Sequence, residues 1–115
     1  MLFRSETDAL LERHIPGVRL VDFGHLGDGN LHYNVQVPEG ADGKAFLRDC
    51  EDQVNTLVFD QVKRFDGSIS AEHGVGELKV VKLPLYKDPT ALAMMRAVKK
   101  ALDPQNIMNP GRVLG

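Results

Sequence analysis

The chain has 115 residues, a length that predicts one modest hydrophobic core and therefore one domain or part of one. Its 14 basic and 16 acidic residues give a net charge of −2, which excludes strong electrostatic attraction to nucleic acid or an anionic membrane. The single cysteine, Cys50, excludes an intrachain disulfide framework and a cysteine-based zinc site, and it favours a reducing compartment. No apolar run approaches the roughly 18 residues of a membrane span, so we expect a soluble, cytoplasmic chain.

Three segments show the apolar spacing or the end signals of helices: residues 2–13, 43–65 and 89–102. Ser5 or Thr7 is the expected cap of the first helix. Asp42 is the expected N-cap of the long second helix, and Gly67 suits the left-handed position after it. Asp88 and the following proline open the last helix, because proline is tolerated at the first helical position.

Residues 18–37 carry the pattern of a β-hairpin. Two strand-like runs flank Asp28-Gly29, a dipeptide typical of two-residue hairpin turns. A further short strand is predicted over residues 68–71, followed by a glycine-rich loop that lacks the spacing of a dinucleotide-binding fingerprint. The sequence therefore predicts a mixture of helices and antiparallel strands.

His25 and His32 of the hairpin are predicted to lie directly opposite each other. This register follows when Asp28-Gly29 forms the centre of the turn, and a four-residue loop over residues 27–30 gives the same pairing. Directly opposed side chains have Cβ atoms about 4.5–5.5 Å apart, close enough for two imidazoles to bind one ion. On geometry alone, ordinary cross-strand neighbours that pack or hydrogen-bond locally are the favoured interpretation, because histidine pairs are more common than metal sites.

The same register assigns the two faces of the hairpin. Val21, Phe23 and Asn34 share the face of the histidines. The opposite face carries the residues expected to form core, which are Leu20, Leu26, Leu31, Tyr33, Val35 and Val37. Asp22 is the charged residue on that apolar face, and the sequence offers no reason for its position.

A metal site would need a third ligand, and Glu72 is a candidate because two histidines with one carboxylate suit divalent transition metals. Small residues precede Glu72 and glycines follow it, a pattern that predicts its presentation at a strand end. The adjacent His73 could act as a general base. Taken alone, this segment favours a solvated loop carboxylate and an incidental histidine.

Three motifs occur in order along the chain: GHLGDGNLHYNV at residues 24–35, GSISAEHGVGELK at residues 67–79 and ALDPQNIMNPGRVL at residues 101–114. Together they resemble the C-terminal part of the FAD-linked oxidases of the vanillyl-alcohol-oxidase type. The branch that they resemble contains D-lactate dehydrogenases, the glycolate oxidase D subunit and D-2-hydroxyglutarate dehydrogenase. The resemblance implies that a D-2-hydroxy acid is oxidised to a 2-oxo acid while a hydride passes to FAD.

The resemblance also implies a role for each motif. In family members that contain metal, the residues corresponding to His25, His32 and Glu72 hold a divalent ion that is zinc- or manganese-like. Such an ion would favour the alkoxide of the substrate and orient its carbon-hydrogen bond toward the flavin. His73 corresponds to the proposed base and substrate contact.

Two asparagines complete the implied site. Asn34 resembles an asparagine that contacts the small 2-hydroxy acid substrate. Asn109, in the NPGR segment, resembles an asparagine that lies near the flavin and so belongs to the cofactor-binding residues.

The implied fold is α+β, an antiparallel sheet with helices on one face, and residues 1–115 correspond to part of the family's C-terminal domain. Nothing in these residues resembles the flavin-binding domain. We therefore expect a fragment, an excised domain or one piece of a split enzyme that needs a flavin-binding domain or subunit and is inactive alone. An incomplete domain would expose a sheet edge or an apolar patch, which self-association into a homo-oligomer could cover.

Two other functions compete with the oxidase. A small hydrolase dependent on a divalent metal could use the same three ligands to activate water, although no HExxH or GxSxG motif is present. A non-catalytic interaction module could instead keep the metal for structure, and removal of the ion would then unfold it.

Overall fold

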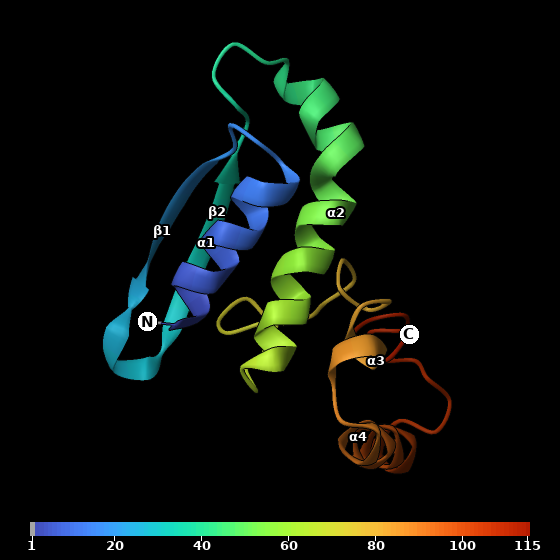
Figure 1. Ribbon diagram of the computed structural model, residues 1–115. Coiled ribbons are helices and arrows are strands. Elements are labelled where there is room, and N and C mark those ends of the chain that lie inside the picture. Colours follow the sequence, from blue (N-terminus) through green and yellow to red (C-terminus); the bar gives the residue numbers. More distant parts are fainter. Residues whose placement is uncertain (1) are drawn as a thin grey trace. The chain divides into compact units, whose positions relative to one another are not determined.

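The computed structural model describes residues 2–115 apart from the side chain of Leu26, so the predicted core position of Leu26 lies outside the described residues (Figure 1). The chain divides into two compact units, the first ending at Gly67 and the second running from Ser68 to Gly115. The first unit contains α1 (Leu2–His14), β1 (Arg19–His25), the 3-10 turn η1 (Leu26–Asp28), β2 (Asn30–Gln36) and α2 (Gly43–Arg64). The second contains α3 (Leu83–Tyr86) and α4 (Pro89–Leu102).

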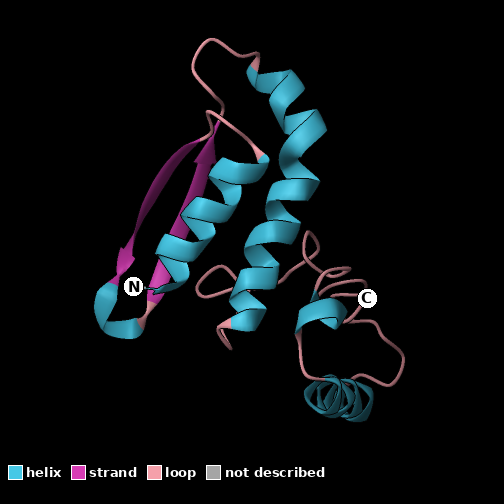
Figure 2. Ribbon diagram, in the orientation of Figure 1, coloured by secondary structure: helices cyan, strands magenta, loops and turns pink. Residues whose placement is uncertain are grey.

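The first unit packs two helices against one face of a two-stranded antiparallel hairpin, as Figure 2 shows with helices in cyan and strands in magenta. Its core consists of buried residues from α1, the following loop and α2: Leu11, Ile15, Val18 and Val54. Leu20, Tyr33 and Val35 of the hairpin pack against this core, and Cys50 of α2 does so too. The predicted α+β class and the predicted apolar face of the hairpin are therefore confirmed.

The two longer predicted helices begin where their local signals place them. The Asp42 carboxylate accepts a hydrogen bond from the amide of Lys44 at 3.0 Å and caps α2. Asp88 accepts one from the amide of Ala91 at 2.9 Å and caps α4, whose first residue is Pro89. Both predicted N-caps are confirmed. The sequence could predict them because such a cap depends on only a few neighbouring residues.

The C-terminus of α2 differs from the prediction by one residue. Asp66, and not Gly67, takes the left-handed conformation, with a φ of 57°. The amide of Gly67 then bonds the carbonyl of Val62 at 2.8 Å, and that of Asp66 bonds Lys63 at 3.0 Å, which is the pairing of a Schellman motif. A Cβ on residue 67 would lie 3.1 Å from Cγ1 of Val62, so this position favours glycine through close packing.

The predicted caps of α1 are wrong, because the helix already begins at Leu2 and includes both residues. Ser5 therefore lies inside the helix. The hydroxyl of Thr7 is buried and donates a hydrogen bond to the carbonyl of Phe3 at 2.6 Å, one helical turn earlier. A threonine hydroxyl that donates to the carbonyl of the preceding turn finds its hydrogen-bond partner within the helix.

The predicted strand over residues 68–71 is also wrong, because this segment forms bends. Its serines bond locally: the Ser68 hydroxyl donates to the carbonyl of Ser70 at 3.1 Å, and the Ser70 hydroxyl donates to the carbonyl of Gly74 at 2.6 Å. Such side-chain bonds compete with a strand ladder. The sequence pattern also gave no indication of the short helix α3, which follows a series of turns.

No helix among residues 2–115 combines the length and the apolar character that crossing a membrane requires.

Candidate functional site

The two histidines of the hairpin share one face but do not lie opposite each other. His25 pairs with Asn30, and His32 pairs with Phe23. The predicted direct pairing is wrong because the turn occupies residues 26–29, with η1 followed by Gly29 at a φ of 68°. The observed loop lies one residue earlier than the predicted four-residue loop over residues 27–30. The cross-strand partner of each strand residue therefore differs from the predicted one by two positions. A shift of two keeps each side chain on its face, so the imidazoles become diagonal neighbours.

Close contact between the strands at Gly24 supports the observed register. A Cβ at this position would overlap the carbonyl oxygen of Asn30 and would lie 2.9 Å from the Cα of Leu31, its cross-strand partner. Only glycine permits this approach. Gly24, the first glycine of the GHLGDGN motif, therefore allows β1 and β2 to approach closely directly beside His25.

The face that carries the histidines is exposed. Phe23 is 59% exposed, and its ring stacks on the imidazole of His32 with 4.9 Å between centroids and 9° between planes. Asn34 lies two residues further along β2 on the same face and is exposed. The structure thus places His25, His32 and Asn34, as predicted, on the face of the hairpin opposite the core, with His32 between the other two.

The donor set for a metal ion is incomplete within the first unit. Diagonal cross-strand neighbours have Cβ atoms up to about 7–8 Å apart, still within reach of two imidazoles that bind a common ion. Nδ1 of His25 also lies 3.8 Å from an Oδ2 oxygen of Asp28 in the turn. No group of three or more His, Cys, Asp or Glu side chains among residues 2–115 is arranged to hold a metal ion.

Glu72 and His73 lie together in the second unit, in the bends held by Ser70 and Gly74. The expected strand end is absent, so backbone turns present these two side chains instead. Nε2 of His73 and Oε2 of Glu72 are 4.0 Å apart, and the His73 side chain is 84% exposed. An exposed imidazole beside a carboxylate can accept a proton from a substrate that approaches from solvent.

Asn109 lies in the C-terminal segment of the second unit. Its φ is 48°, a left-handed conformation that asparagine tolerates better than most residues. Its carbonyl accepts a hydrogen bond from the amide of Arg112 at 3.3 Å, and its side chain is exposed. The NPGR segment is therefore a tight turn that presents the amide of Asn109 outward.

The structure gives a reason for Asp22, the charged residue on the apolar face of the hairpin. The Asp22 side chain is 1% exposed, and neither oxygen has a hydrogen-bond partner in the described part of the chain. Nε of Arg4 in α1 lies 3.3 Å from Oδ2 of Asp22, and Arg4 also pairs with Asp8 at 3.6 Å. The hydroxyl of Tyr33, opposite Asp22 in the ladder, donates a hydrogen bond to the Asp8 carboxylate.

Burial raises the pKa of Asp22 above its ordinary value of 3.8, the neighbouring Asp8 carboxylate raises it further, and Arg4 lowers it, so that the pKa lies at about 6. Burial likewise raises the pKa of Tyr33, together with its hydrogen bond to Asp8. Asp22 therefore joins α1 to the hairpin. Periodicity reveals such a residue as a charge on an apolar face, but its partners on α1 follow only from packing.

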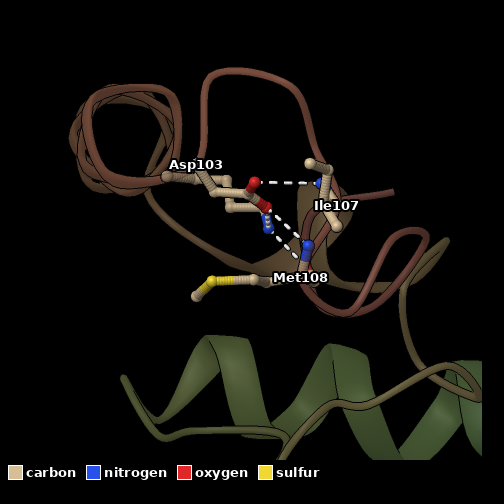
Figure 3. A network of polar contacts seen from close by, with 4 residues as sticks. Asp103, Ile107 and Met108 are labelled. Carbon is tan, nitrogen blue, oxygen red and sulfur yellow. Dashed lines mark hydrogen bonds and ion pairs between the residues drawn. The ribbon is translucent and has the colours of Figure 1, made fainter.

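A second polar network, which the sequence did not indicate, lies immediately before Asn109 (Figure 3). Asp103 follows α4, is 8% exposed and accepts hydrogen bonds from the amides of Ile107 and Met108, each at 2.9 Å. Lys99 donates to the Asp103 carboxylate and to the carbonyl of Met108. The bond from Lys99, aided by the two amides, lowers the pKa of Asp103. The carboxylate is therefore held ionised within the turn.

The comparison with protein families gives a match along nearly the whole chain. Residues 3–113 match the family described as FAD linked oxidases, C-terminal domain. The chain belongs to this family. The three sequence motifs lie within the matched residues, apart from the last leucine of the third, and the predicted resemblance is confirmed.

Relatives of this FAD-linked oxidase domain carry related names. A D-2-hydroxyglutarate dehydrogenase of Stutzerimonas stutzeri is 45% identical over 111 residues, which are 96% of this chain and 24% of that protein. One of Xanthomonas citri is also 45% identical, over 96% of this chain and 23% of that protein. A D-2-hydroxyglutarate–pyruvate transhydrogenase of Saccharomyces cerevisiae is 37% identical over 83% of this chain and 18% of its own length. The domain thus spans about a quarter or less of these relatives.

Proposed function

We propose that this chain is the C-terminal part of a flavin-dependent D-2-hydroxy acid dehydrogenase, which oxidises the hydroxy acid to a 2-oxo acid with hydride transfer to FAD. The observation that carries the proposal is the family match over residues 3–113, together with the dehydrogenase relatives. D-2-hydroxyglutarate is the first substrate to test, because the names of these relatives contain it.

FAD would be held mainly by a flavin-binding domain or subunit outside these residues. When bound, it supplies the acceptor of the hydride, and the protein supplies position and charge. Asn109 fits a contact with the flavin, because its exposed side-chain amide offers both a donor and an acceptor for the polar atoms of the ring system. The turn around Asn109 would orient that amide.

His25, His32 and Glu72 are the proposed ligands of a divalent metal, zinc- or manganese-like. The fit rests on the chemistry of the donor set and on the two imidazoles that share an exposed face of the hairpin. When bound, the metal supplies Lewis-acid stabilisation of the substrate hydroxyl and carboxylate oxygens.

Two further side chains act on the substrate in this proposal. Asn34 hydrogen-bonds the hydroxy acid and orients it, since its amide lies on the face of the two histidines. His73 accepts the hydroxyl proton at a ring nitrogen as the carbon-bound hydride leaves. Its exposure and its neighbour Glu72 support that role.

The test measures anaerobic bleaching of oxidised flavin absorbance by D-2-hydroxyglutarate in the flavin-loaded protein, reconstituted with its flavin-binding domain or subunit. His73→Gln removes the proton acceptor and should slow flavin reduction by about 10²–10⁴-fold. His14→Gln is the matched control, because His14 lies at the end of α1 and bonds the carbonyl of Leu10. It should leave the rate unchanged.

Unchanged flavin reduction in His73→Gln would remove His73 from the proton transfer. Wild-type protein that binds flavin but reduces it with none of D-2-hydroxyglutarate, D-lactate and glycolate would overturn the proposed activity itself.

A further inference from the structure

The turn that precedes Asn109 is organised by two side chains rather than by solvent. One Asp103 carboxylate accepts two successive backbone amides, Ile107 and Met108, through separate oxygens. Lys99 connects Oδ2 of Asp103 with the carbonyl of Met108 (Figure 3). Three polar groups of a short segment are thus bound by one ion pair, in which the Asp103 carboxylate is buried and the Lys99 side chain is partly exposed.

This network supports a segment in which two residues have unfavourable backbone conformations. Asn106 and Asn109 both have left-handed conformations, with φ values of 53° and 48°. Residues in sparsely populated conformations persist when their surroundings hold them there. Hydrogen bonds to a charged group are stronger than neutral ones, and Asp103 is ionised, buried and directly attached to the end of α4.

Asn109 lies directly after the last residue held by this network. The carbonyl of Met108, which Lys99 binds, belongs to the peptide group that ends at the nitrogen of Asn109. A change in that peptide plane would rotate the Asn109 backbone and redirect its amide. Side chains that fix the supporting segment can therefore determine the direction of a functional group that they do not touch.

We propose that Asp103 and Lys99 are positioning residues that fix the peptide before Asn109, so that its side-chain amide is held ready for the flavin. This inference rests on the proposed function, because it uses Asn109 as a flavin contact. We assign to Asp103 and Lys99 no contact of their own with flavin or substrate. They transmit their effect through residues 104–108.

The first experiment measures amide hydrogen exchange in the 115-residue chain without flavin. Asp103→Asn removes the charge and one acceptor, and Lys99→Met removes the donor while keeping a long apolar stem. Each should speed exchange at Ile107 and Met108 by about tenfold, while α2 keeps its protection. Lys100→Met is the matched control, because Lys100 is exposed on the same helix. It should exchange like the wild type.

The second experiment follows the bound flavin itself, through its absorption spectrum and its reduction potential in the reconstituted protein. Asn109→Gly deletes the amide but tolerates the left-handed conformation. Asp103→Asn and Lys99→Met should shift the spectrum and potential in the same direction as Asn109→Gly, and they should lower kcat about tenfold or more with little change in KM. Adding Asp103→Asn to Asn109→Gly should cause no further shift.

Each outcome decides one question. Unchanged exchange in both single variants would overturn the positioning role without reference to flavin. Faster exchange with an additive flavin shift in the double variant would show that Asp103 does not act through Asn109, and would also overturn it. If Asn109→Gly leaves the flavin spectrum and potential unchanged, the contact assumed in the proposed function fails, whatever the exchange data show.

Discussion

Asp22 illustrates how one side chain can set the pH dependence of stability. Its carboxylate is buried between α1 and the hairpin, with Arg4 as its ion-pair partner and Asp8 as a nearby like charge. Its pKa rises from an ordinary value of 3.8 to about 6. Between these values the folded state retains a proton that the unfolded state has lost. Stability from protonated Asp22 is therefore full below about pH 4 and declines as the pH rises to about 6.

Asp22→Asn should remove that decline. Asparagine has the same shape and no charge at any pH, so the variant should be more stable than the wild type at pH 7.5 by about 1–3 kcal/mol. The measurement is urea unfolding at several pH values from 4 to 7.5. Asp49→Asn is the control, since Asp49 is exposed on α2, and it should follow the wild-type profile. Parallel profiles for wild type and Asp22→Asn would contradict the assignment.

The hairpin shows how the two faces of an element can be predicted correctly although its register differs from the prediction. The turn lies at residues 26–29, so the partners move by two positions while the faces stay the same. His25 and His32 therefore remain on the exposed face, and Tyr33 remains on the core face. Contact at Gly24 keeps the strands close at the end that carries His25.

Gly24→Ala should distort this element. The added methyl group would overlap the Asn30 carbonyl, so we expect a loss of about 3 kcal/mol in the free energy of unfolding and altered amide shifts at His25 and His32. Gly27→Ala is the matched control from the same motif, because a Cβ at Gly27 would meet no atom within 4 Å. Equal stability of the two variants, measured by denaturant unfolding, would contradict the close-contact explanation.

At the scale of the folded first unit, the core and the two histidines proposed as metal ligands lie on opposite faces of the hairpin. The core of the first unit consists of Leu11, Ile15, Val18 and Val54, on the face of the hairpin away from the histidines. Hydrophobic burial provides most of the stability of such a unit. A metal on the exposed face would therefore contribute chemistry more than folding, in contrast to a domain that a metal stabilises.

Metal content and melting temperature test this separation together. The purified chain should contain about one zinc- or manganese-like ion by elemental mass spectrometry, and His32→Ala should lose it. Chelation should then lower the melting temperature by only a few degrees, as expected for a loss near 1 kcal/mol. His14→Ala should retain the ion. Absence of metal from the wild type would contradict the ligand assignment, and complete unfolding on chelation would favour the metal-stabilised interaction module.

The sequence alone determined the features that depend on neighbouring residues. The caps Asp42 and Asp88, the lengths of α2 and α4 and the two faces of the hairpin all follow from short-range spacing. The family also follows from the sequence, because three ordered motifs carry it. The prediction of a strand over residues 68–71 was wrong, because the serine side chains form local hydrogen bonds that the apolar pattern does not reveal.

Only the tertiary structure decided which side chains meet across the chain. The ion pair between Asp22 and Arg4 requires α1 to pack on the hairpin. The hydrogen bonds from Met108 to Asp103 and from Lys99 to Met108 require the C-terminal segment to fold back toward the end of α4. Spacing along a helix or strand identifies the face of a residue. Its partner depends on how the buried apolar surfaces of separate elements fit together, and that is a property of the packed molecule.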